Sequence, residues 1–549
     1  MSRAPFKSSQ QVDFVIVGSG AAGGVMAKEL STAGFSVVVL EQGPYLREKD
    51  FKHDEFGVIN KSQLTNDYNR QPNTVRKNES EVAQIMPAVG YGRQVGGGSV
   101  HFTANYWRFH ESDFHERSLL GEVPGAMLED WPLSYNDLEA YYTKAEYELG
   151  ISGIAGANPF EAPRSKPYPL PPMPVKSSGA LFERATKKLG LHPFPAPMAI
   201  LSQPYRGRGA CTHCGFCEGF GCEMRAKSST LATVIPVAER TGNCEIRADA
   251  YVRKIETDVQ GRATGVIYFD RARHEVFQKA KAVILCANGA ETPRLLLLSE
   301  SSRAPHGLAN SSGLVGRNLM VDTWAFAFGV FEHQLNEYKS IQVTRLIHDY
   351  YASDPKRGFY GGAGIDARFD YYPISFALDA MPPDAPKWGA GFKKMLAEYF
   401  TRTMTLEAHC SCLPVHTNSI SLDPTVKDEW GLPAIRVTYT SHPDDVKTTH
   451  WAAERMLEIM DAAGARKTWS IPYGDVFPSV HLMGTCRMGN DPAKSVVNTD
   501  HRAHGVRNLF VVDGSSLVTC GRQQPTATIQ ALAYRAAERI GKMAKTGEI

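Results

Sequence analysis

The chain carries almost no excess charge of either sign. Its 549 residues include 60 Lys and Arg against 58 Asp and Glu, which gives a net charge of +2. Proteins that bind nucleic acid or anionic membranes usually carry a basic excess, because their ligands present many phosphates. The near balance of charge therefore argues against both classes, and we expect no nucleic-acid partner.

Long apolar runs are also missing. No uninterrupted stretch reaches the roughly 18 residues that a membrane-spanning helix needs. The apolar segment 12–17 is too short for the core of a secretory signal, and Asp13 interrupts it. We therefore expect no direct membrane span and no signal peptide on this chain. The expected location is the periplasm, reached by co-export with a partner subunit, or otherwise the cytoplasm.

Cysteine is scarce, with ten residues in 549, far below the content of a disulfide-rich scaffold. A chain of this length can bury a large core, so neither disulfides nor a metal is needed for folding. Hydrophobic content of 43% and charged content of 21% are those of an ordinary globular protein. Length alone suggests roughly three to four domain-sized units.

The N-terminal segment has the order of elements that binds a dinucleotide. A buried parallel strand is predicted over residues 14–17, a helix over 22–32 and a second apolar strand over 36–40. Between the first strand and the helix stands the pattern G-x-G-x-x-G, and the second strand runs into Glu41. The complete order is much more specific than the glycine pattern alone, although it does not separate FAD from NAD.

Each residue of this motif has a physical reason. Gly18 permits the tight turn, Gly20 lets the backbone approach a pyrophosphate, and Gly23 lets the helix pack on the strand. The N-terminus of the helix offers amides and positive potential to the phosphates. Glu41 can accept hydrogen bonds from the ribose hydroxyls.

Elsewhere the coarse pattern predicts a helix over 137–149, a long closing helix over 526–542 and an amphipathic helix-and-loop insert over 375–400. Seven prolines fall within 159–174. Because proline lacks an amide donor, we expect an extended surface connection there.

Further glycine-rich and polar segments identify a family. They are Gly92–Ser99, Asn288–Pro293 after an apolar strand at 282–287, His481–Gly489, Asn508–Gly514 and Gln524–Thr526. Together with the N-terminal motif, and in this order over nearly the whole chain, they resemble the glucose–methanol–choline (GMC) family of FAD-dependent oxidoreductases. The stretch 131–142 and a cysteine-rich insert are similar to those of the FAD subunits of bacterial glucose, fructose, gluconate and glucoside 3-dehydrogenases.

The resemblance implies an α/β fold with two domains. One is a Rossmann-like FAD-binding domain and the other a substrate domain with a large, mostly antiparallel sheet. We expect the FAD-binding domain to be discontinuous, over 10–110, 230–325 and 475–549. The substrate domain is expected over 111–229 and 326–474, and it includes the insert at 205–230.

The family pattern carries over to this chain residue by residue. Residues expected to hold the ADP half of FAD are Gly18, Gly20, Gly23 and Glu41. Residues expected around the pyrophosphate, ribityl chain and flavin are Arg93, Gly96, Gly97, Gly98, Ser99, Asp513, Gly514 and Thr526.

His481 matches the catalytic histidine of the family. Alcohol oxidation requires a base for the hydroxyl proton while hydride leaves the carbon, and histidine has a suitable intrinsic pKa. Any one of the 17 histidines would otherwise be a packing or surface residue. That interpretation is kept for His409, His501 and His504, and for His101, which follows the Gly96–Ser99 loop and is expected near the flavin.

The second catalytic position departs from the family, which usually places His or Asn before the terminal Pro-Thr. Here Gln524 stands at that position. Its amide keeps a donor and an acceptor on a side chain one methylene longer than Asn. Gln524 is therefore expected to orient the substrate hydroxyl or polarise the product carbonyl, with Gln523 as a competing candidate.

The cysteines at 211–222 are spaced C-x2-C-x2-C-x4-C and comprise Cys211, Cys214, Cys217 and Cys222. Three interpretations compete. Iron–sulfur ligation suits the C-x2-C-x2-C run, whereas zinc usually takes two separated C-x2-C pairs and neighbouring disulfides would be strained. The subgroup resemblance favours a 3Fe–4S cluster, with 4Fe–4S as the alternative because the spacing differs.

The expected activity is a dehydrogenase for the hydroxyl of a sugar or glycoside, with C3 of a glucoside as the first guess. Hydride passes to flavin, and electrons pass through the iron–sulfur cluster to a cytochrome c or quinone-linked acceptor. A small subunit that carries an export signal is the expected partner. Alternatives are an oxygen-using oxidase with a structural metal loop, a non-catalytic electron-carrier flavoprotein, and an NAD enzyme.

Overall fold

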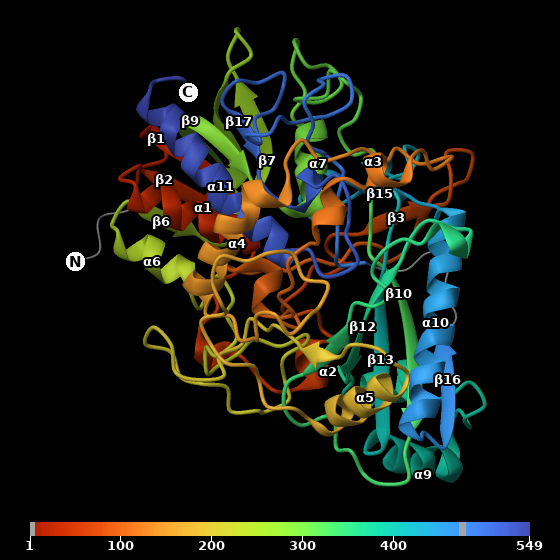
Figure 1. Ribbon diagram of the computed structural model, residues 1–549. Coiled ribbons are helices and arrows are strands. Elements are labelled where there is room, and N and C mark those ends of the chain that lie inside the picture. The colour runs from red at the N-terminus through yellow and green to blue at the C-terminus, as the bar shows by residue number, and fades with distance from the viewer. Residues whose placement is uncertain (1–5, 472–478) are drawn as a thin grey trace.

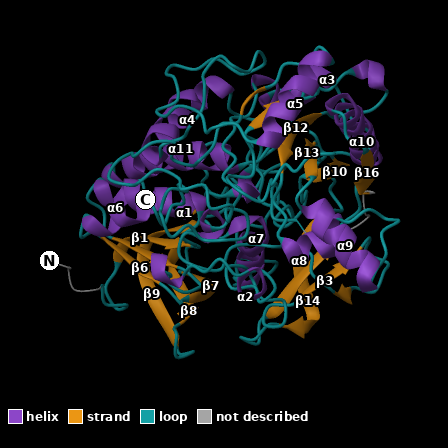
Figure 2. Ribbon diagram, turned by 90° about the horizontal axis from the view of Figure 1, so that it is seen from below, coloured by secondary structure: helices purple, strands orange, loops and turns teal. Residues whose placement is uncertain are grey.

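The computed structural model of the protein describes residues 6–471 and 479–549 (Figure 1). Two large sheets form its framework, and most helices pack against one or the other. Figure 2 shows their strands in separate groups, with helices and long loops between them. The expected α/β fold with two large sheets is confirmed, while the exact domain boundaries stay a prediction.

The first sheet contains the predicted nucleotide-binding strands. Its main path runs β6-β2-β1-β9-β8-β7, and β17 pairs with residues 283–285, at the C-terminal end of β9. The strands are β1 Val12–Val17, β2 Val37–Leu40, β6 Cys244–Arg247, β7 Tyr251–Thr257, β8 Ala263–Phe269, β9 Glu275–Leu285 and β17 Leu509–Val511. Neighbouring strands are parallel along β6-β2-β1-β9, and β17 is parallel to β9. Strand β8 is antiparallel to both of its neighbours, β9 and β7.

Helices bury the parallel part of this sheet, which explains why its strands are continuously apolar. Residues 37–40 of β2 are fully buried, and α1 (Ala21–Thr32) packs on β1 and β2. Two further helices, α11 (Thr526–Lys545) and α6 (Val234–Arg240), pack against α1. Helices from the two ends of the sequence therefore pack together, because α11 lies beside α1 (Figure 1).

The second sheet is entirely antiparallel and has the order β16-β10-β13-β12-β11-β5. Its strands are β5 Phe194–Pro195, β10 Thr323–Val330, β11 Arg345–Ile347, β12 Ala363–Arg368, β13 Thr403–Cys410 and β16 Lys467–Ile471. The long helix α10 (Pro443–Ala463) and α5 (Ser177–Lys188) cover one face.

Strand β13 is buried at all eight residues, and its two faces differ in chemistry. Met404, Leu406, Ala408 and Cys410 pack into a cluster with apolar residues of α10. Because successive side chains alternate between faces, Glu407 and His409 point to the opposite side. The second sheet therefore turns a buried polar face away from α10.

The remaining described strands form a third sheet of four strands, in the order β14-β15-β3-β4. These are β3 Asn73–Arg76, β4 Gln84–Ile85, β14 Ser419–Lys427 and β15 Pro433–Thr438. The remaining α-helices are α2 Glu55–Val58, α3 Glu116–Leu120, α4 Tyr135–Leu149, α7 Asn288–Leu298, α8 Pro373–Ser375 and α9 Gly389–Phe400. None of the described helices is both long and apolar enough to cross a membrane.

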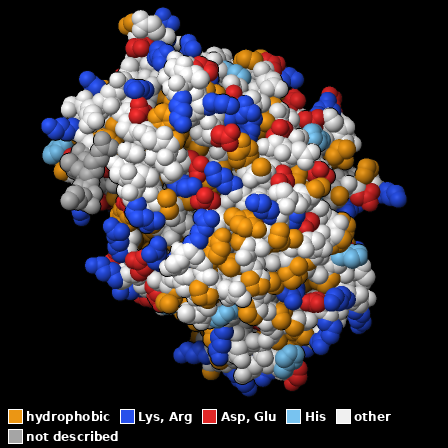
Figure 3. Space-filling model, turned by 60° about the vertical axis from the view of Figure 1, so that its left-hand side comes forward, with side chains coloured by type: hydrophobic (Ala, Val, Ile, Leu, Met, Phe, Trp, Pro, Cys, Tyr) orange, Lys and Arg blue, Asp and Glu red, His pale blue; other side chains and the backbone are white. Residues whose placement is uncertain are grey.

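The predicted local elements agree with the structure. Helix α4 begins at Tyr135, two residues earlier than expected, because Ser134 and Asp137 cap each other's backbone amides. Residues 159–174 form neither helix nor strand, and the insert at 375–400 contains α9. On the face in Figure 3, acidic and basic side chains are interspersed, as the balanced composition implies.

Asn508 ties β8 and β9 together just ahead of β17. Its side-chain oxygen accepts from Ala263 N at 2.9 Å, and its nitrogen donates to the carbonyls of Ala263 and Lys281 at 2.7 and 2.6 Å. Asn508→Ala leaves these buried groups unpaired and should lower the free energy of unfolding by about 2–4 kcal/mol. Urea-induced unfolding measures this loss. Asn60→Ala, at an exposed side chain, is the control, and an equal effect from both would contradict the assigned role.

Candidate active site

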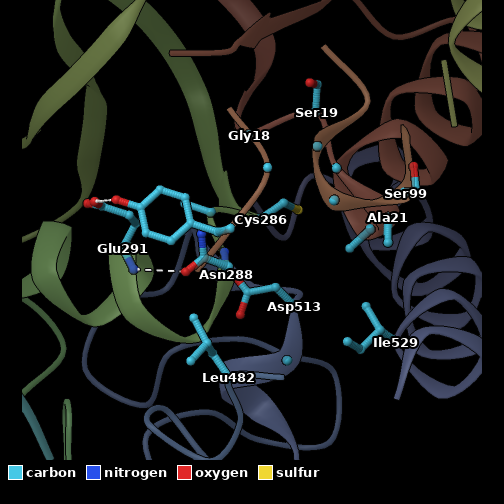
Figure 4. Close-up of a pocket in the computed structure, with 18 of the residues that line it drawn as sticks. Gly18, Ser19, Ala21, Ser99, Cys286, Asn288, Glu291, Leu482, Asp513 and Ile529 are labelled. Carbon is cyan, nitrogen blue, oxygen red and sulfur yellow. Dashed lines mark hydrogen bonds between the residues drawn. The ribbon is translucent and has the colours of Figure 1, made fainter. Parts of the chain in front are cut away.

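A cavity of about 280 Å³ opens at the carboxyl ends of β1, β2 and β9. This end of a parallel sheet is where dinucleotides bind, because the strand-to-helix turns converge there. Its walls come from segments far apart in the chain, as Figure 4 shows for residues between Gly18 and Ile529. Predicted site residues on its wall are Gly18, Gly20, Glu41, Gly97, Gly98, Ser99, His481, Asp513, Gly514, Gln524 and Thr526.

The glycines at one end of the cavity let backbone segments pack closely against each other. Gly18 has φ +93°, and a Cβ there would meet Cys286 O at 2.4 Å. Gly97 has φ +54°, and its Cβ would lie 2.7 Å from the Cα of Gly20. Two glycine turns thus approach closely at the start of α1, the place where dinucleotide-binding folds hold a pyrophosphate.

Glu41 is held rigidly at the end of β2. Its carboxylate accepts from Ser19 Oγ at 2.7 Å, Ser19 N at 3.1 Å and Gly43 N at 3.1 Å. Burial raises the pKa of Glu41, and these hydrogen bonds oppose the rise. The arrangement fixes a carboxylate on the cavity wall at the end of β2, and its contact with a ribose stays a prediction.

Asp513 lies against the N-terminus of α7 (Figure 4). It accepts hydrogen bonds from Asn288 N at 3.1 Å and Thr292 Oγ1 at 2.6 Å, and from the amide and hydroxyl of Ser515 at 2.9 and 2.5 Å. These contacts join the C-terminal motif to the helix that follows β9. The neighbouring Gly514 has no room for a side chain, because a Cβ would lie 2.6 Å from Leu482 O.

His481 lies on the cavity wall and is oriented by a carboxylate. Its Nδ1 is 2.6 Å from Oδ2 of Asp322, the residue directly before β10. A carboxylate oxygen accepts a hydrogen bond, so the hydrogen lies on Nδ1. The ring also packs edge to face with Trp324, at 5.6 Å between centroids. This arrangement leaves Nε2 as the ring nitrogen that can take a proton from a substrate.

Gln524 lies on the same cavity wall, and His409 of β13 contacts its side chain. Gln524 Nε2 lies 2.7 Å from His409 Nε2. Sequence reasoning kept His409 as a packing residue, and the structure places it in the core, in direct contact with Gln524. Gln523, the competing candidate, donates to Arg108 O and lines a different cavity.

Three residues expected around the cofactor are not on the cavity wall: Arg93, Gly96 and Gly23. Arg93 does not line the cavity, because its guanidinium reaches toward Glu429, 3.4 Å away. Gly23 lies under the turn rather than in the cavity, and a Cβ there would be 2.0 Å from Gly18 O. Its role is helix-on-strand packing, as the motif predicts.

His101 is on the cavity wall, as expected, and burial lowers its pKa to about 4. Asn105 and Glu218 also line the cavity and were not anticipated. Asp322, the partner of His481, was missed as well. Sequence spacing offers no signal for Asp322, because 159 residues separate it from His481.

The four clustered cysteines surround one small cavity of their own. All ten cysteines are free, so the disulfide interpretation is wrong. Among the described residues, no group of three His, Cys, Asp or Glu is placed to hold a metal ion, so a single structural zinc ion does not fit. Burial raises the pKa of the Cys217 thiol to about 12, and Lys227 lies near enough to oppose that rise.

The cysteine segment packs directly on the wall of the main cavity. Gly219 N donates to His101 O at 2.8 Å, and the buried Lys227 Nζ bridges Phe102 O and Cys217 O. Glu218, next to Cys217, reaches the main cavity and hydrogen bonds with Thr103. The two cavities are therefore separated by only a few residues.

Comparison with known proteins gives matches over nearly the whole chain. Two models described as GMC oxidoreductase match residues 12–323 and 414–533. The 2-methyl-1,2-propanediol dehydrogenase of Mycolicibacterium austroafricanum is 35% identical, covering 97% of this chain and 96% of that one. The fructose dehydrogenase large subunit of Gluconobacter japonicus is 30% identical, covering 97% and 98%.

Among solved structures, formate oxidase of Aspergillus oryzae superposes with a TM-score of 0.70 at 16% identity. The match covers 98% of this chain and all of that chain. At this identity the likeness bears on the fold alone. It agrees with the two-sheet architecture described above.

Glu41→Ala should weaken FAD binding by about 10- to 100-fold, because a charged acceptor for the ribose hydroxyls is lost. Titration of flavin-free protein with FAD, followed by quenching of flavin fluorescence, measures the dissociation constant. Glu275→Ala, at an exposed carboxylate at the start of β9, is the control. Unchanged affinity in Glu41→Ala would show that the dinucleotide lies elsewhere.

Proposed function

Because the chain belongs to the GMC oxidoreductase family, we propose that it is an FAD-dependent dehydrogenase that oxidises a hydroxyl of a sugar, glycoside or related polyol to a carbonyl. The family acts on alcohol groups, and the 35% identical relative is named as a diol dehydrogenase. The observation that carries the proposal is the pair His481–Asp322 on the wall of a dinucleotide-binding cavity.

The residues present fit FAD. The turns at Gly18, Gly20 and Gly97 pack closely against backbone and line the cavity at the start of α1, where helix amides can hold a pyrophosphate. Glu41 is on the same wall, where its carboxylate can accept hydrogen bonds from ribose hydroxyls, and Asp513 lies at the N-terminus of α7. When bound, FAD supplies the hydride acceptor, and the protein supplies orientation and polarity.

The protein's own part in the reaction is to receive a proton. The substrate hydroxyl donates to Nε2 of His481, which takes the proton as hydride leaves the carbon. Asp322 keeps Nδ1–H directed away from the substrate and stabilises the imidazolium that results, since the carboxylate lies 2.6 Å away. Gln524 faces the same space and orients the substrate.

Within this class we propose a carbohydrate substrate, with C3 of a glucoside as the first candidate. A relative at 30% identity is named for fructose, which supports a sugar. Buried polar side chains on the cavity wall, among them Asn105 and Gln524, suit a ligand with several hydroxyls better than a simple alcohol.

We further propose that the clustered cysteines hold an iron–sulfur cluster, of 3Fe–4S or 4Fe–4S type, that takes electrons from the flavin site. Four thiols around one cavity are the donor set that iron–sulfur clusters use. A cluster keeps its thiolates farther apart than a single ion does, so the poor fit to one ion does not count against it. Contact between Glu218 and the main cavity supports a short path.

The proposed acceptor is a cytochrome c, and the proposed partner is a small subunit that carries the export signal. The name of the fructose dehydrogenase relative as a large subunit supports a multi-subunit enzyme. Cys214 is exposed, so the cysteine segment reaches the surface where an acceptor can dock. Release of electrons to oxygen instead would identify an oxidase.

Replacing His481 tests the base. His481→Ala should slow flavin reduction by substrate about 10²- to 10⁴-fold, because the hydroxyl proton loses its acceptor. Anaerobic stopped-flow absorbance at the flavin band measures the rate, and the same spectrum shows that FAD is still bound. A near-normal rate of flavin reduction in this variant would contradict the assignment of His481 as the base. His450→Ala, on the exposed face of α10, is the control.

Metal analysis tests the cluster. Protein purified without oxygen should contain about three to four iron atoms per chain and give an iron–sulfur EPR signal. Cys217→Ser should lower the iron content, whereas Cys244→Ser, in β6 and away from the cluster of thiols, should retain it. If the purified protein contains its full complement of flavin but no iron, electron transfer through an iron–sulfur cluster is contradicted.

A further inference from the structure

Lys227 is a buried cation between the cysteine cavity and the main cavity. Only 2% of its surface is exposed, and it lines the cavity that the four clustered cysteines surround. Its Nζ donates to three backbone carbonyls, those of Phe102 at 3.1 Å, Cys217 at 2.6 Å and Phe220 at 2.8 Å. Phe102 belongs to the wall of the main cavity and Cys217 to the cysteine cavity, so the ammonium group lies between the two.

The three carbonyls indicate that Lys227 is charged. An ammonium group has three N–H donors and no acceptor, whereas a neutral amine would turn its lone pair toward one of the carbonyls. Burial lowers the pKa of Lys227, and the nearby thiols of Cys217 and Cys222 oppose that fall. The side chain therefore places a positive charge inside the protein.

No carboxylate forms an ion pair with Lys227 in the part of the chain that the structure describes. Two carboxyl groups are near, and each has another partner. That of Glu218 is hydrogen bonded to Thr103 on the wall of the main cavity. That of Glu223 is 44% exposed and lies 3.5 Å from His53. The positive charge of Lys227 must therefore be balanced by other groups.

The groups that remain are thiols. Those of Cys217, Cys222 and Cys214 are near enough to stabilise the Lys227 ammonium once they are ionised. A thiol balances a cation only as a thiolate, and thiolates are the ligands of iron–sulfur clusters. The buried charge of Lys227 therefore indicates that the cysteine cavity holds negative charge.

Arg208 is a second buried cation beside the cysteine segment. It is 7% exposed, and its guanidinium donates to the carbonyls of Arg225, at 3.2 Å, and Leu149, and to Ser228 Oγ at 3.0 Å. Burial and the charge of Arg225 lower the pKa of Arg208 to about 10, whereas the Cys222 thiol opposes the fall. Across the described ranges of the chain, Arg208 forms no ion pair with a carboxylate either.

Burying a charge costs free energy unless an opposite charge compensates it. Other buried cations, such as Arg294 and Arg368, meet carboxylates at 2.7 and 2.6 Å. Lys227 and Arg208 have thiols in that place. An iron–sulfur cluster with its thiolates is an anion, and each electron that it accepts adds one negative charge. Buried cations beside it therefore favour the reduced cluster and raise its reduction potential.

We propose that Lys227, supported by Arg208, balances the charge of an anionic iron–sulfur cluster in the cysteine cavity and raises the reduction potential of that cluster. The inference rests on the proposed function and adds the residues that favour electron flow away from the flavin. Each electron from the reduced flavin passes to the cluster and then to the proposed cytochrome c. Two such transfers return the flavin to its oxidised form and release the transferred hydride hydrogen as a proton.

A redox titration of Lys227 variants tests the inference. Protein purified without oxygen is poised at graded potentials, EPR gives the fraction of reduced cluster, and absorbance shows that FAD is bound. Lys227→Gln removes the charge but keeps an amide donor for the carbonyls. It should disfavour the reduced cluster about tenfold, which lowers the midpoint potential by about 59 mV. Lys227→Arg keeps the charge and should keep most of the wild-type potential.

Two further variants complete the comparison. Lys52→Gln is the matched control, because Lys52 is exposed and stands next to His53, which lines the same cavity. Water and salt screen an exposed charge, so the potential should stay near its wild-type value. Arg208→Gln should lower the potential in the same direction as Lys227→Gln. If Lys227→Gln does not fold, as judged by circular dichroism, Arg208→Gln decides in its place.

Iron content, measured on the same samples, separates the outcomes. Loss of iron from Lys227→Gln but not from Lys227→Arg, with FAD retained in both, would support the inference, because the charge then holds the cluster. An unchanged potential in Lys227→Gln, or equal losses of potential or iron in both variants, would overturn it and leave the proposed function intact. Wild-type protein with FAD but no iron would contradict the proposed cluster itself, and the inference with it.

Discussion

The side chains proposed to be catalytic depend on one buried strand with two unlike faces. Strand β13 alternates apolar and polar residues and is buried throughout. Its apolar face packs on α10, and its polar face must therefore satisfy every charge and hydrogen bond without water. Arg368, Asp366 and Glu407 form an ion-pair network on that face, and His409 contacts both Arg368 and Gln524.

His481 is held by the same sheet in a parallel manner. Asp322 precedes β10, the direct neighbour of β13, and accepts a hydrogen bond from Nδ1 of His481. The first sheet, in contrast, contributes its glycine turns and Glu41 to the cavity. In the proposed function, one wall of the cavity therefore holds the cofactor and another orients the proton acceptor. This division of labour is what oxidation of an alcohol against a bound cofactor needs.

Local signals in the sequence predicted the dinucleotide site well. Strand, turn, helix and carboxylate follow one another within about thirty residues, so each could be placed by its own spacing. Helices α4 and α11 were likewise predicted from periodicity, although the cap at Ser134 that sets the start of α4 was not. His481 and Gln524 required the family resemblance, because a lone histidine or glutamine has no diagnostic spacing. Their place on the cavity wall agrees with that assignment.

The remaining site residues were not predictable from spacing, because tertiary structure alone brings them together. Asp322, His409 and Arg368 contact partners between 41 and 159 residues away, across sheet pairings that no local pattern specifies. Arg93 shows the converse, since a residue beside a glycine motif turns to Glu429 instead of the cavity. The spacing of the four cysteines predicted that they share one site, and they line one cavity. That Glu218 lines the main cavity could not be predicted from the sequence, because only the fold brings it there.

The most direct test of the proposed chemistry is an anaerobic titration of the purified flavoprotein with a panel of diols, sugars and glycosides. Flavin absorbance and the carbonyl product are measured together. Alcohol oxidation at this cavity predicts that at least one compound bleaches the flavin with one carbonyl formed per flavin reduced. A flavin that stays oxidised with every compound, in protein that holds FAD fully, would contradict it.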